Sequence, residues 1–342
     1  MQTYHGQACS WRASADAFDC GSYGAVMRVS PAGPTEMPAL MDASWGDGTV
    51  GAKGRFALKR PRTTRGLARD PCTDGERMHR KRLVRLEIEV LQRVKHAHII
   101  ALVDHARDPV HPFYVMPRYE HTLFTLAAEY GALPGLVRPA AQQLYDALAH
   151  LHAAGLAHCD VSPQNVLVSR TDFRRDVHVI LCDFGSARCA QHTGALGEWR
   201  RAVQWALVRG VSHECMTWVW SAAPECWVSE QCENIVPNTL CDVWAAAFTA
   251  LSVSGMLGPE LTACQVENPH LECDVIKRAR AWGWEYDPQD LAVFRRIHPH
   301  LPGERGGELA LLLASRVFVD WYRRARAEQL AEWLRQGLPA DL

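Results

Sequence analysis

One stretch in the middle of the chain decides the fold: Leu156-Ala157-His158-Cys159-Asp160-Val161-Ser162-Pro163-Gln164-Asn165-Val166-Leu167-Val168. An amphipathic helical pattern ends before it and an apolar run closes it, so the sequence predicts a loop between a helix and a strand. Within this loop, Asp160 could take the proton of an incoming hydroxyl while Asn165 holds a magnesium ion. Taken alone, the two residues would also suit a capping aspartate and a turn asparagine.

A second carboxylate follows the predicted strand. Residues 166–169 and 177–181 are predicted to form a hairpin, and Asp183-Phe184-Gly185 comes directly after it. Because the hairpin returns the chain to its starting point, we expect Asp183 beside Asn165, where its oxygens suit a Mg²⁺ ion that bridges phosphates. An isolated Asp-Phe-Gly would be interpreted as a turn.

Lys59 ends a short apolar strand predicted over residues 55–59. A buried ammonium is costly unless it is paired, so we expect Lys59 to reach phosphates and one carboxylate. The candidate is Glu87, on a helix predicted from residue 76 onward. Glu89 is the rival, and Glu87 is preferred because Leu91 follows it by one turn into the same core. On its own, Lys59 would fit a surface lysine whose stem packs on apolar neighbours.

Glycines upstream offer a way to approach phosphates. Gly21-Ser22-Tyr23-Gly24 lies between two short strands predicted from Ala15 to Val29. Glycine lets backbone N–H groups come close to phosphate oxygens, and Val26 would then pack on a purine. These residues alone are also compatible with an ordinary hairpin turn.

The hydrophobic periodicity divides the chain into two halves near Tyr119. Short strand-like runs before it, including residues 99–103 and 113–116, accompany one helix. The segments 30–54 and 60–75 have the composition of loops. After Tyr119, helices are predicted over residues 136–153, 242–254, 309–319 and 327–334.

Composition excludes several classes of protein. At 342 residues and a formal net charge of -1, the chain can bury a sizeable core and has no bulk charge for nucleic acid or membranes. Its 12 cysteines form no zinc-binding spacing. No apolar run approaches the ~20 residues of a membrane span, and no signal-peptide pattern follows Met1. We therefore expect a soluble protein of a reducing compartment.

In their order and spacing, these motifs resemble the eukaryotic-type protein kinase family, and Ala223-Pro224-Glu225 and Asp242-Val243-Trp244 extend the match. The resemblance implies an α+β, bilobal protein kinase fold, with a small antiparallel-sheet N-lobe carrying one main helix and a larger, mostly helical C-lobe. The implied boundaries are a short extension over 1–14, an N-lobe over 15–116, a hinge over 117–119, a C-lobe over 120–335 and a tail over 336–342.

The same resemblance implies ATP and Mg²⁺ as cofactors. Asp160, Lys59 and Glu87 would be catalytic, and Asn165 and Asp183 would bind the metal. Arg324 would form a structural ion pair with Glu225. The implied nucleotide-binding positions are Gly21, Ser22, Gly24, Val26, Ala57, Lys59, Met116 at the gatekeeper position and Tyr119 at the adenine-binding hinge.

Three positions depart from the family pattern. Asp19 replaces the first glycine of the loop, so phosphate clamping is expected to be looser. Cys159 replaces the arginine before the catalytic aspartate, so we expect no strict dependence on a phosphate in the activation loop. Ser162 replaces a lysine that contacts the transferred phosphate, which lowers the expected turnover. An extended, partly packed activation segment is predicted from its tryptophans, Trp199, Trp205, Trp218 and Trp220.

His-Cys-Asp-Val-Ser-Pro-x-Asn, the Met-Pro-Arg-Tyr hinge, the insertion before Lys59 and the arginine-rich composition are similar to the conserved protein kinases of herpesviruses, of the alphaherpesvirus tegument type. That similarity implies a serine/threonine kinase with autophosphorylation, acting on viral and host proteins. It implies a location in the host nucleus and cytoplasm and in the virion tegument. No direct binding to nucleic acid or membrane is expected.

Two other functions fit parts of the pattern. A pseudokinase-like scaffold would bind partners through the same fold. Cys159, Ser162 and Asp19 favour this function slightly, and the intact Lys59, Asp160, Asn165 and Asp183 oppose it. A small-molecule phosphotransferase is opposed by residues 223–225 and the long activation segment, which suit a protein substrate. Binding of ATP and Mg²⁺ together with transfer of labelled phosphate would separate an active kinase from a scaffold.

Overall fold

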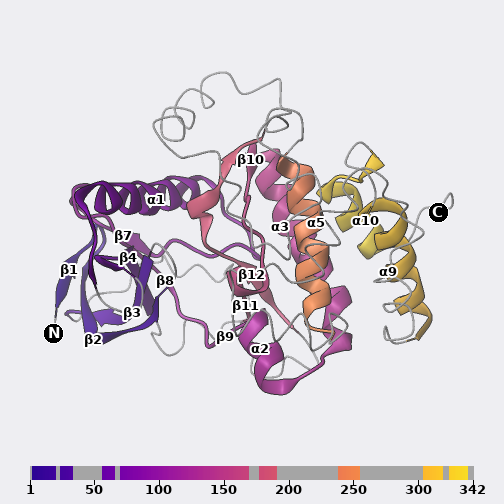
Figure 1. The fold of residues 1–342 in the computed structure, drawn as a ribbon, viewed down its shortest axis with the longest axis horizontal. Coiled ribbons are helices and arrows are strands. Elements are labelled where there is room, and N and C mark those ends of the chain that lie inside the picture. The colour runs from indigo at the N-terminus through magenta and orange to yellow at the C-terminus, as the bar shows by residue number, and fades with distance from the viewer. Residues whose placement is uncertain are drawn as a thin grey trace. The chain divides into compact units, whose positions relative to one another are not determined.

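A computed structural model of the chain describes residues 2–20, 24–33, 56–65, 70–168, 177–190, 238–254, 303–318 and 323–337. The chain forms two compact units. The first comprises Met1–Tyr119 with Asp183–Ser186, and the second comprises Glu120–Cys182 with Ala187–Leu342. Figure 1 shows the fold as a ribbon and labels most of the helices and strands.

The first unit is built on a six-stranded sheet with the order β1-β2-β3-β4-β8-β7, in which neighbouring strands are antiparallel. A bridge joins Gly6 to Ala106, and the N–H of Gln7 donates to the carbonyl of His105 at 2.9 Å. The sheet therefore curls until its two edges pair with each other, which protects backbone groups that an open edge would expose. Its strands are β1 (Thr3–His5), β2 (Ser10–Cys20), β3 (Gly24–Pro31), β4 (Phe56–Pro61), β7 (Asp104–His105) and β8 (Tyr114–Pro117).

Apolar side chains on one face of these strands fill the inside of the curled sheet. Phe56 and Leu58 of β4, Met27 of β3 and Val115 of β8 belong to one cluster with Trp11. The rings of Trp11 and Phe56 meet edge to face with centroids 5.2 Å apart. Because side chains alternate along a strand, the residues between these lie on the opposite face.

One buried carboxylate ties the N-terminal segment to this sheet. Asp104 accepts hydrogen bonds from the backbone N–H groups of Ala8 (3.0 Å) and Cys9 (3.3 Å) and from Nε1 of Trp11 (2.7 Å). Residues 1–14, predicted as a short extension, thus contribute β1 and the start of β2. The strand predicted from Ala15 begins at Ser10.

Two short segments differ from the prediction. Residues 99–103, predicted as a strand, form none beyond an isolated bridge at Ile99, although Ile99 and Ile100 are buried. A short apolar run can be buried in a strand or in irregular chain, so hydropathy does not separate the two. The loop predicted over residues 60–75 contains the paired strands β5 (Thr64–Arg65) and β6 (Asp70–Pro71).

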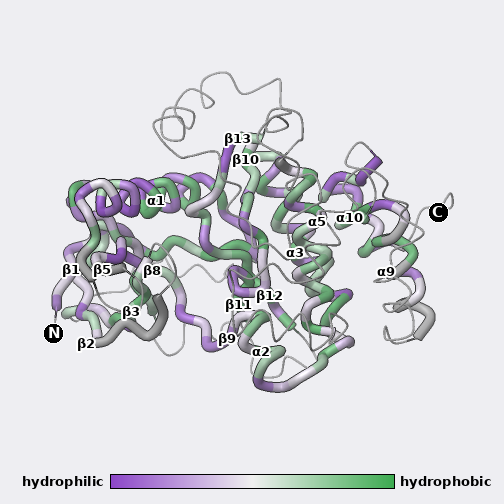
Figure 2. Tube along the Cα trace, in the orientation of Figure 1, coloured by the Kyte–Doolittle hydropathy of each residue, from purple (hydrophilic) through white to green (hydrophobic). Residues whose placement is uncertain are grey.

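Helix α1 (Asp74–Arg93) begins at a capping box in which Thr73 and Glu76 exchange hydrogen bonds. Figure 2 shows hydrophilic and hydrophobic residues alternating along it. Glu87 lies among the buried residues of this helix, and a carboxylate in that position requires partners. The buried apolar residues of α1 are Leu83, Val84, Leu86, Ile88, Val90 and Leu91.

The second unit is centred on α3 (Val137–Ala153), which packs against α5 (Asn238–Ser252) and α10 (Ala327–Gln336). Arg335 of α10 forms an ion pair with Asp146 of α3 at 2.9 Å. The described residues of this unit also form the helices α2 (Leu123–Tyr130), η1 (Pro134–Leu136), η2 (Pro163–Asn165) and α9 (Gly303–Arg316). The four helices predicted for this half of the chain are observed as α3, α5, α9 and α10.

The predicted hairpin after Asn165 is present in the second unit. Strands β11 (Val166–Val168) and β12 (Val179–Leu181) pair antiparallel, with Val166 opposite Leu181. Strand β9 (His121–Thr122) joins them, and β10 (Leu156–Ala157) pairs with β13 (Arg188–Cys189). Within the described ranges, no helix has both the length and the apolar character needed to span a bilayer.

Candidate active site

The register of three neighbouring strands gathers most of the predicted nucleotide-binding residues on one face of the sheet. Val26 of β3 pairs with Lys59 of β4, and Lys59 pairs with Tyr114 of β8. Ala57 pairs with Met116 in the same way. Directly paired residues share a face, as do residues two positions apart along one strand. The face opposite the apolar cluster therefore carries Gly24, Val26, Ala57, Lys59, Tyr114 and Met116.

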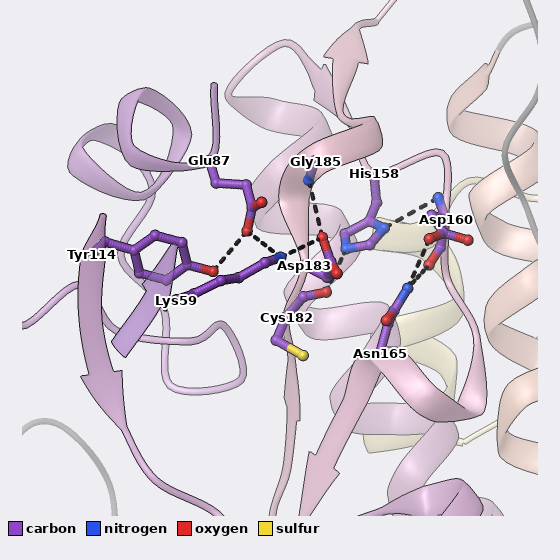
Figure 3. A network of polar contacts seen from close by, with 9 residues as sticks. All are labelled: Lys59, Glu87, Tyr114, His158, Asp160, Asn165, Cys182, Asp183 and Gly185. Carbon is purple, nitrogen blue, oxygen red and sulfur yellow. Dashed lines mark hydrogen bonds and ion pairs between the residues drawn. The ribbon is translucent and has the colours of Figure 1, made fainter. Parts of the chain in front are cut away.

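Lys59 is held by two carboxylates. Its ammonium lies 2.8 Å from Oε2 of Glu87 and 2.9 Å from Oδ1 of Asp183, and the residue is 7% exposed (Figure 3). Burial alone would lower the pKa of this ammonium, but the charges of Asp183 and Glu87 outweigh burial and hold the pKa above its usual value. Lys59 is thus a buried, charged lysine and not a surface lysine.

Glu87, and not Glu89, is the partner from α1. Glu89 is exposed, whereas Glu87 is 2% exposed and accepts hydrogen bonds from Lys59 and from the Tyr114 hydroxyl, the latter at 2.6 Å. Burial raises the pKa of Glu87 to about 7, against the opposing influence of Lys59 and Tyr114. Tyr114 was not among the predicted site residues, and its only sequence signal is a hydroxyl within an apolar strand.

Gly24 begins β3 and faces the stem of Lys59. A Cβ atom added at Gly24 would lie 2.7 Å from Cε of Lys59, so any side chain here would displace the lysine. Gly21 and Ser22, predicted to contact phosphates, lie outside the described residues, as does the side chain of Asp19. Tyr119 is half-buried and is the last residue of its stretch of the first unit.

Asp183 has an unusual backbone conformation. Its φ of 64° lies in the left-handed region that non-glycine residues rarely adopt and that often marks functional sites. It precedes the short helix η3 (Phe184–Ser186), and the N–H of Gly185 donates to its Oδ1 at 3.3 Å. The side chain is 41% exposed, so this carboxylate is accessible although its partner Lys59 is buried.

In the second unit, the loop after β10 brings Asp160 and Asn165 together. Nδ2 of Asn165 donates to the backbone carbonyl and to Oδ2 of Asp160, both at 2.9 Å (Figure 3). Since the nitrogen of the amide faces Asp160, its oxygen is directed away from that carboxylate. Asn165 thus holds the Asp160 carboxylate in one orientation and keeps an oxygen ligand for other use.

His158 is fully buried and links this loop to the residue before Asp183. Its Nδ1 accepts the backbone N–H of Asp160 at 3.2 Å. Because that nitrogen accepts, Nε2 carries the proton and donates to the carbonyl of Cys182 at 3.0 Å. Both ring nitrogens are engaged in backbone contacts, which is a structural role.

Asp242 anchors the same loop from α5. This buried carboxylate accepts the backbone N–H groups of His158 and Cys159, each at 2.8 Å, and contacts Nε2 of His152 at 3.0 Å. Cys159 has a φ of 61°, so the backbone is held in an uncommon conformation directly beside Asp160. The sequence-based prediction gave Asp242 no role, although one carboxylate in an otherwise apolar helix was the signal for it.

Some of the remaining predicted residues lie within the described part of the chain and others lie outside it. Ser162, at the position of the absent lysine, is fully buried. Arg324 donates to the carbonyls of Val317 and Leu240, both at 2.9 Å, and its guanidinium lies 5.1 Å from the ring centroid of Trp244. Its predicted partner Glu225, the segment 223–225 and the tryptophans of the activation segment lie outside the described residues.

Comparison with known proteins is consistent with this geometry. Residues 58–268 match the family model of the protein kinase domain. Serine/threonine-protein kinase D2 of Homo sapiens is 36% identical over 108 residues, which are 31% of this chain and 12% of that protein. Serine/threonine-protein kinase PknL of Mycobacterium tuberculosis is 37% identical over 110 residues, which are 30% of this chain and 25% of that protein.

A solved structure is similar over nearly the whole chain. The crystal structure of the Rad53 kinase domain and SCD2 aligns with a TM-score of 0.55 and 16% identity, over 95% of this chain and 88% of that one. The predicted protein kinase fold is thereby confirmed, and the chain belongs to the protein kinase domain family. It spans only a minor part of the curated relatives, 12% of kinase D2 and 25% of PknL.

Proposed function

We propose that the chain is an ATP-dependent serine/threonine protein kinase. The observation that carries the proposal is the buried Lys59 ammonium, bound at 2.8 Å by Glu87 and at 2.9 Å by Asp183. A cation held in this way by side chains around it can receive phosphate oxygens with little reorganisation. Membership of the protein kinase domain family and the serine/threonine kinases among its relatives support the same activity.

The first unit would bind the nucleotide. Lys59 would contact the α- and β-phosphates, with Glu87 holding it in place. Val26, Ala57 and Met116 lie on the same face of the sheet and would offer an apolar surface to the adenine. By family resemblance, Tyr119, Gly21 and Ser22 would complete the nucleotide site.

Magnesium fits the residues present. Asp183 offers an accessible carboxylate, and Asn165 offers an amide oxygen that is directed away from Asp160. Such hard oxygen donors are the ligands that Mg²⁺ prefers. When bound, the ion would neutralise phosphate charge, and Asp183 and Asn165 are the residues that would hold it.

Asp160 would act on the substrate. It would orient the serine or threonine hydroxyl and accept its proton while the hydroxyl oxygen bonds to the γ-phosphorus. The bond between that phosphorus and the β,γ-bridging oxygen breaks, and ADP leaves. The two hydrogen bonds from Asn165 at 2.9 Å and the anchoring of the loop by Asp242 support this role, since they restrict the carboxylate before substrate binds.

Two residues favour a kinase with modest turnover. Cys159 offers no charge to an activation-loop phosphate, and the buried Ser162 offers none to the transferred phosphate. Activity would then not depend on phosphorylation of the loop.

The finer assignment is a herpesvirus kinase of the tegument type, which rests on the sequence resemblance of the Asp160 loop and the hinge at residues 116–119. Such a kinase would phosphorylate viral and host proteins and itself, in the nucleus and cytoplasm of the host cell and in the virion tegument. Phosphosite mapping in cells infected with virus carrying the wild-type chain or Asp160→Asn tests this assignment. Serine and threonine sites on viral and host proteins should disappear with Asp160→Asn, and an unchanged set of sites would contradict it.

The activity itself is tested with the purified chain, γ-labelled ATP, Mg²⁺ and a basic protein substrate. Wild type should label serine or threonine, and Asp160→Asn should lower the rate by about 10²-fold or more without changing the melting temperature. Binding of ATP and Mg²⁺ by wild type with no transfer to any protein would instead support the scaffold function.

A further inference from the structure

Tyr114 contributes a hydroxyl to the buried ion pair of the first unit. It lies in β8 directly opposite Lys59 of β4 and is 1% exposed. Its hydroxyl donates to Oε2 of Glu87 at 2.6 Å, and Lys59 donates to the same oxygen at 2.8 Å (Figure 3). One carboxylate oxygen of α1 therefore receives donors from two adjacent strands of the sheet.

This arrangement is not required by packing. Every residue of β8 is buried, and apolar side chains suit buried positions, so packing alone does not require a hydroxyl at position 114. A buried carboxylate is stable only when it is paired and hydrogen-bonded, and bonds to a charged acceptor are about twice as strong as neutral ones. The hydroxyl thus stabilises Glu87 in the one position where it also reaches Lys59.

Among the described residues, no side chain of α1 donates a hydrogen bond to the Glu87 carboxylate. Its acceptor bonds come from β4 and β8, so movement of α1 that separates Glu87 from Lys59 also breaks the bond to Tyr114. Both bonds are lost together in a buried site, and leaving buried polar groups unsatisfied is costly. Tyr114 therefore adds to the free-energy difference between the paired and unpaired positions of Glu87.

We propose that Tyr114 is a positioning residue that holds Glu87 against Lys59. It would thereby keep the Lys59–Glu87 ion pair assembled without help from a phosphorylated activation loop. The inference rests on the proposed function, since it assigns Tyr114 a part in the same reaction. Cys159, at the position of the usual phosphate-binding arginine, gives a reason for such a device. The Lys59 ammonium and the Tyr114 hydroxyl both favour the ionised form of Glu87, whose pKa burial raises to about 7.

The test is Tyr114→Phe, which removes the hydroxyl and keeps the ring. We expect kcat/KM for ATP to fall by about tenfold or more, because a bond to a charged acceptor is lost. The KM for the protein substrate should stay unchanged, since the Tyr114 hydroxyl bonds to Glu87 of the nucleotide-binding unit. Unchanged kinetics toward ATP would overturn the proposal, whatever the effect on melting temperature.

Tyr145→Phe is the matched control. Tyr145 is also fully buried, but its hydroxyl donates to the carbonyl of Val243 at 3.4 Å in the second unit. This variant removes a buried hydroxyl bond elsewhere and should leave the kinetics toward ATP as in wild type. An equal loss in both variants would assign the effect to general destabilisation and overturn the positioning role.

A double-mutant cycle tests whether Tyr114 acts through Glu87. In a Glu87→Ala background, which removes the acceptor of the Tyr114 hydroxyl, Tyr114→Phe should cause less than about a twofold further loss, because contacting residues are not additive. A full additional loss would show that Tyr114 acts elsewhere.

A readout that does not need activity separates this inference from the proposed function. In Tyr114→Phe, amide hydrogen exchange of the α1 residues 83–91 should be faster than in wild type and in Tyr145→Phe. If wild type transfers no phosphate, the proposed activity fails while this exchange result still supports or contradicts the role of Tyr114. Unchanged exchange in α1 would overturn the role.

Discussion

The two units hold their site residues by different means. In the first, Lys59 is held by charged side chains, with Glu87 at 2.8 Å and Asp183 at 2.9 Å. In the second, Asp160 is held by the Asn165 amide, and its loop is held by backbone bonds to Asp242. One group is an ion-pair cluster assembled from distant segments, and the other is a shaped loop.

This difference predicts that substitutions will have different consequences in the two groups of residues. In an ion-pair cluster, removing one charge upsets the balance of the charges that remain, so the remaining residues move or change protonation. In a shaped loop, the functional side chain can be replaced with little effect on shape, whereas loss of the buried anchor disturbs the backbone. Substitutions in the two groups should therefore separate binding, transfer and stability.

The largest effect on phosphate transfer is expected when a substitution at Asp183, in the ion-pair cluster, is compared with one at Asp160, in the shaped loop. Asp183→Ala should lower phosphate transfer by about 10³-fold and weaken Mg²⁺-dependent binding of ATP, since it removes a proposed metal ligand and a partner of Lys59. Asp160→Asn should lose transfer but bind ATP as wild type does. Calorimetric titration of ATP with and without Mg²⁺ measures this difference in binding. Equal binding of ATP by both variants would contradict the prediction.

Each unit also has one buried carboxylate that accepts backbone N–H groups, Asp104 in the first and Asp242 in the second. Replacing either by alanine should lower the free energy of unfolding by about 3–5 kcal/mol, because buried donors lose their acceptor. Denaturant titration of both variants measures this cost.

The two variants should differ in activity. At a temperature where both are folded, Asp242→Ala should transfer phosphate far more slowly, because the Asp160 loop loses its anchor. Asp104→Ala should stay near wild type, because Asp104 holds the N-terminal segment. Equal activity of the two variants would show that the loop keeps its shape without Asp242.

A smaller effect is expected within α1. Glu87→Gln keeps a hydrogen-bond acceptor but removes the charge beside Lys59, and it should lower kcat/KM for ATP by about tenfold. Glu89→Gln, on the exposed side of the same helix, should leave kcat/KM unchanged. Steady-state kinetics with ATP measure kcat/KM for both variants. A comparable loss of kcat/KM in Glu89→Gln would contradict a specific role for the Lys59–Glu87 pair.

The smallest expected effect is at Gly24. In Gly24→Ala the new Cβ would lie 2.7 Å from Cε of Lys59, so the lysine must shift within a site where two carboxylates hold its ammonium. We expect a loss of a few-fold, about 1 kcal/mol, in kcat/KM for ATP with no change in melting temperature. A stopped assay at subsaturating ATP would detect it, and wild-type rates would mean that the lysine stem adapts freely.

Much of the candidate site could be predicted from sequence because its residues lie at the ends of regular elements. Lys59 ends an apolar strand, Asp183 follows the hairpin, and Glu87 falls on the buried stripe of a helix. The choice between Glu87 and Glu89 needed helical phase, which the following Leu91 supplied. The strands were harder to place, since a run such as 99–103 is buried without pairing and β2 begins five residues before its predicted start.

The contributions of Tyr114 and Asp242 could not be predicted from local pattern. Tyr114 reaches Glu87 only because the register of β4 and β8 places it opposite Lys59, and register depends on contacts far apart in the chain. Asp242 serves a loop 83 and 84 positions before it, at Cys159 and His158. The sequence shows a polar residue within an apolar segment in each case, but it does not show which groups that residue contacts.

The central claim is that Lys59 is the residue on which phosphate transfer depends. The most direct measurement compares autophosphorylation by purified Lys59→Met with Lys95→Met, an exposed lysine just beyond α1. Lys59→Met should lose at least about 10²-fold in rate while remaining folded, because the charge at the phosphates is gone, and Lys95→Met should act as wild type. Full autophosphorylation by folded Lys59→Met would contradict the account.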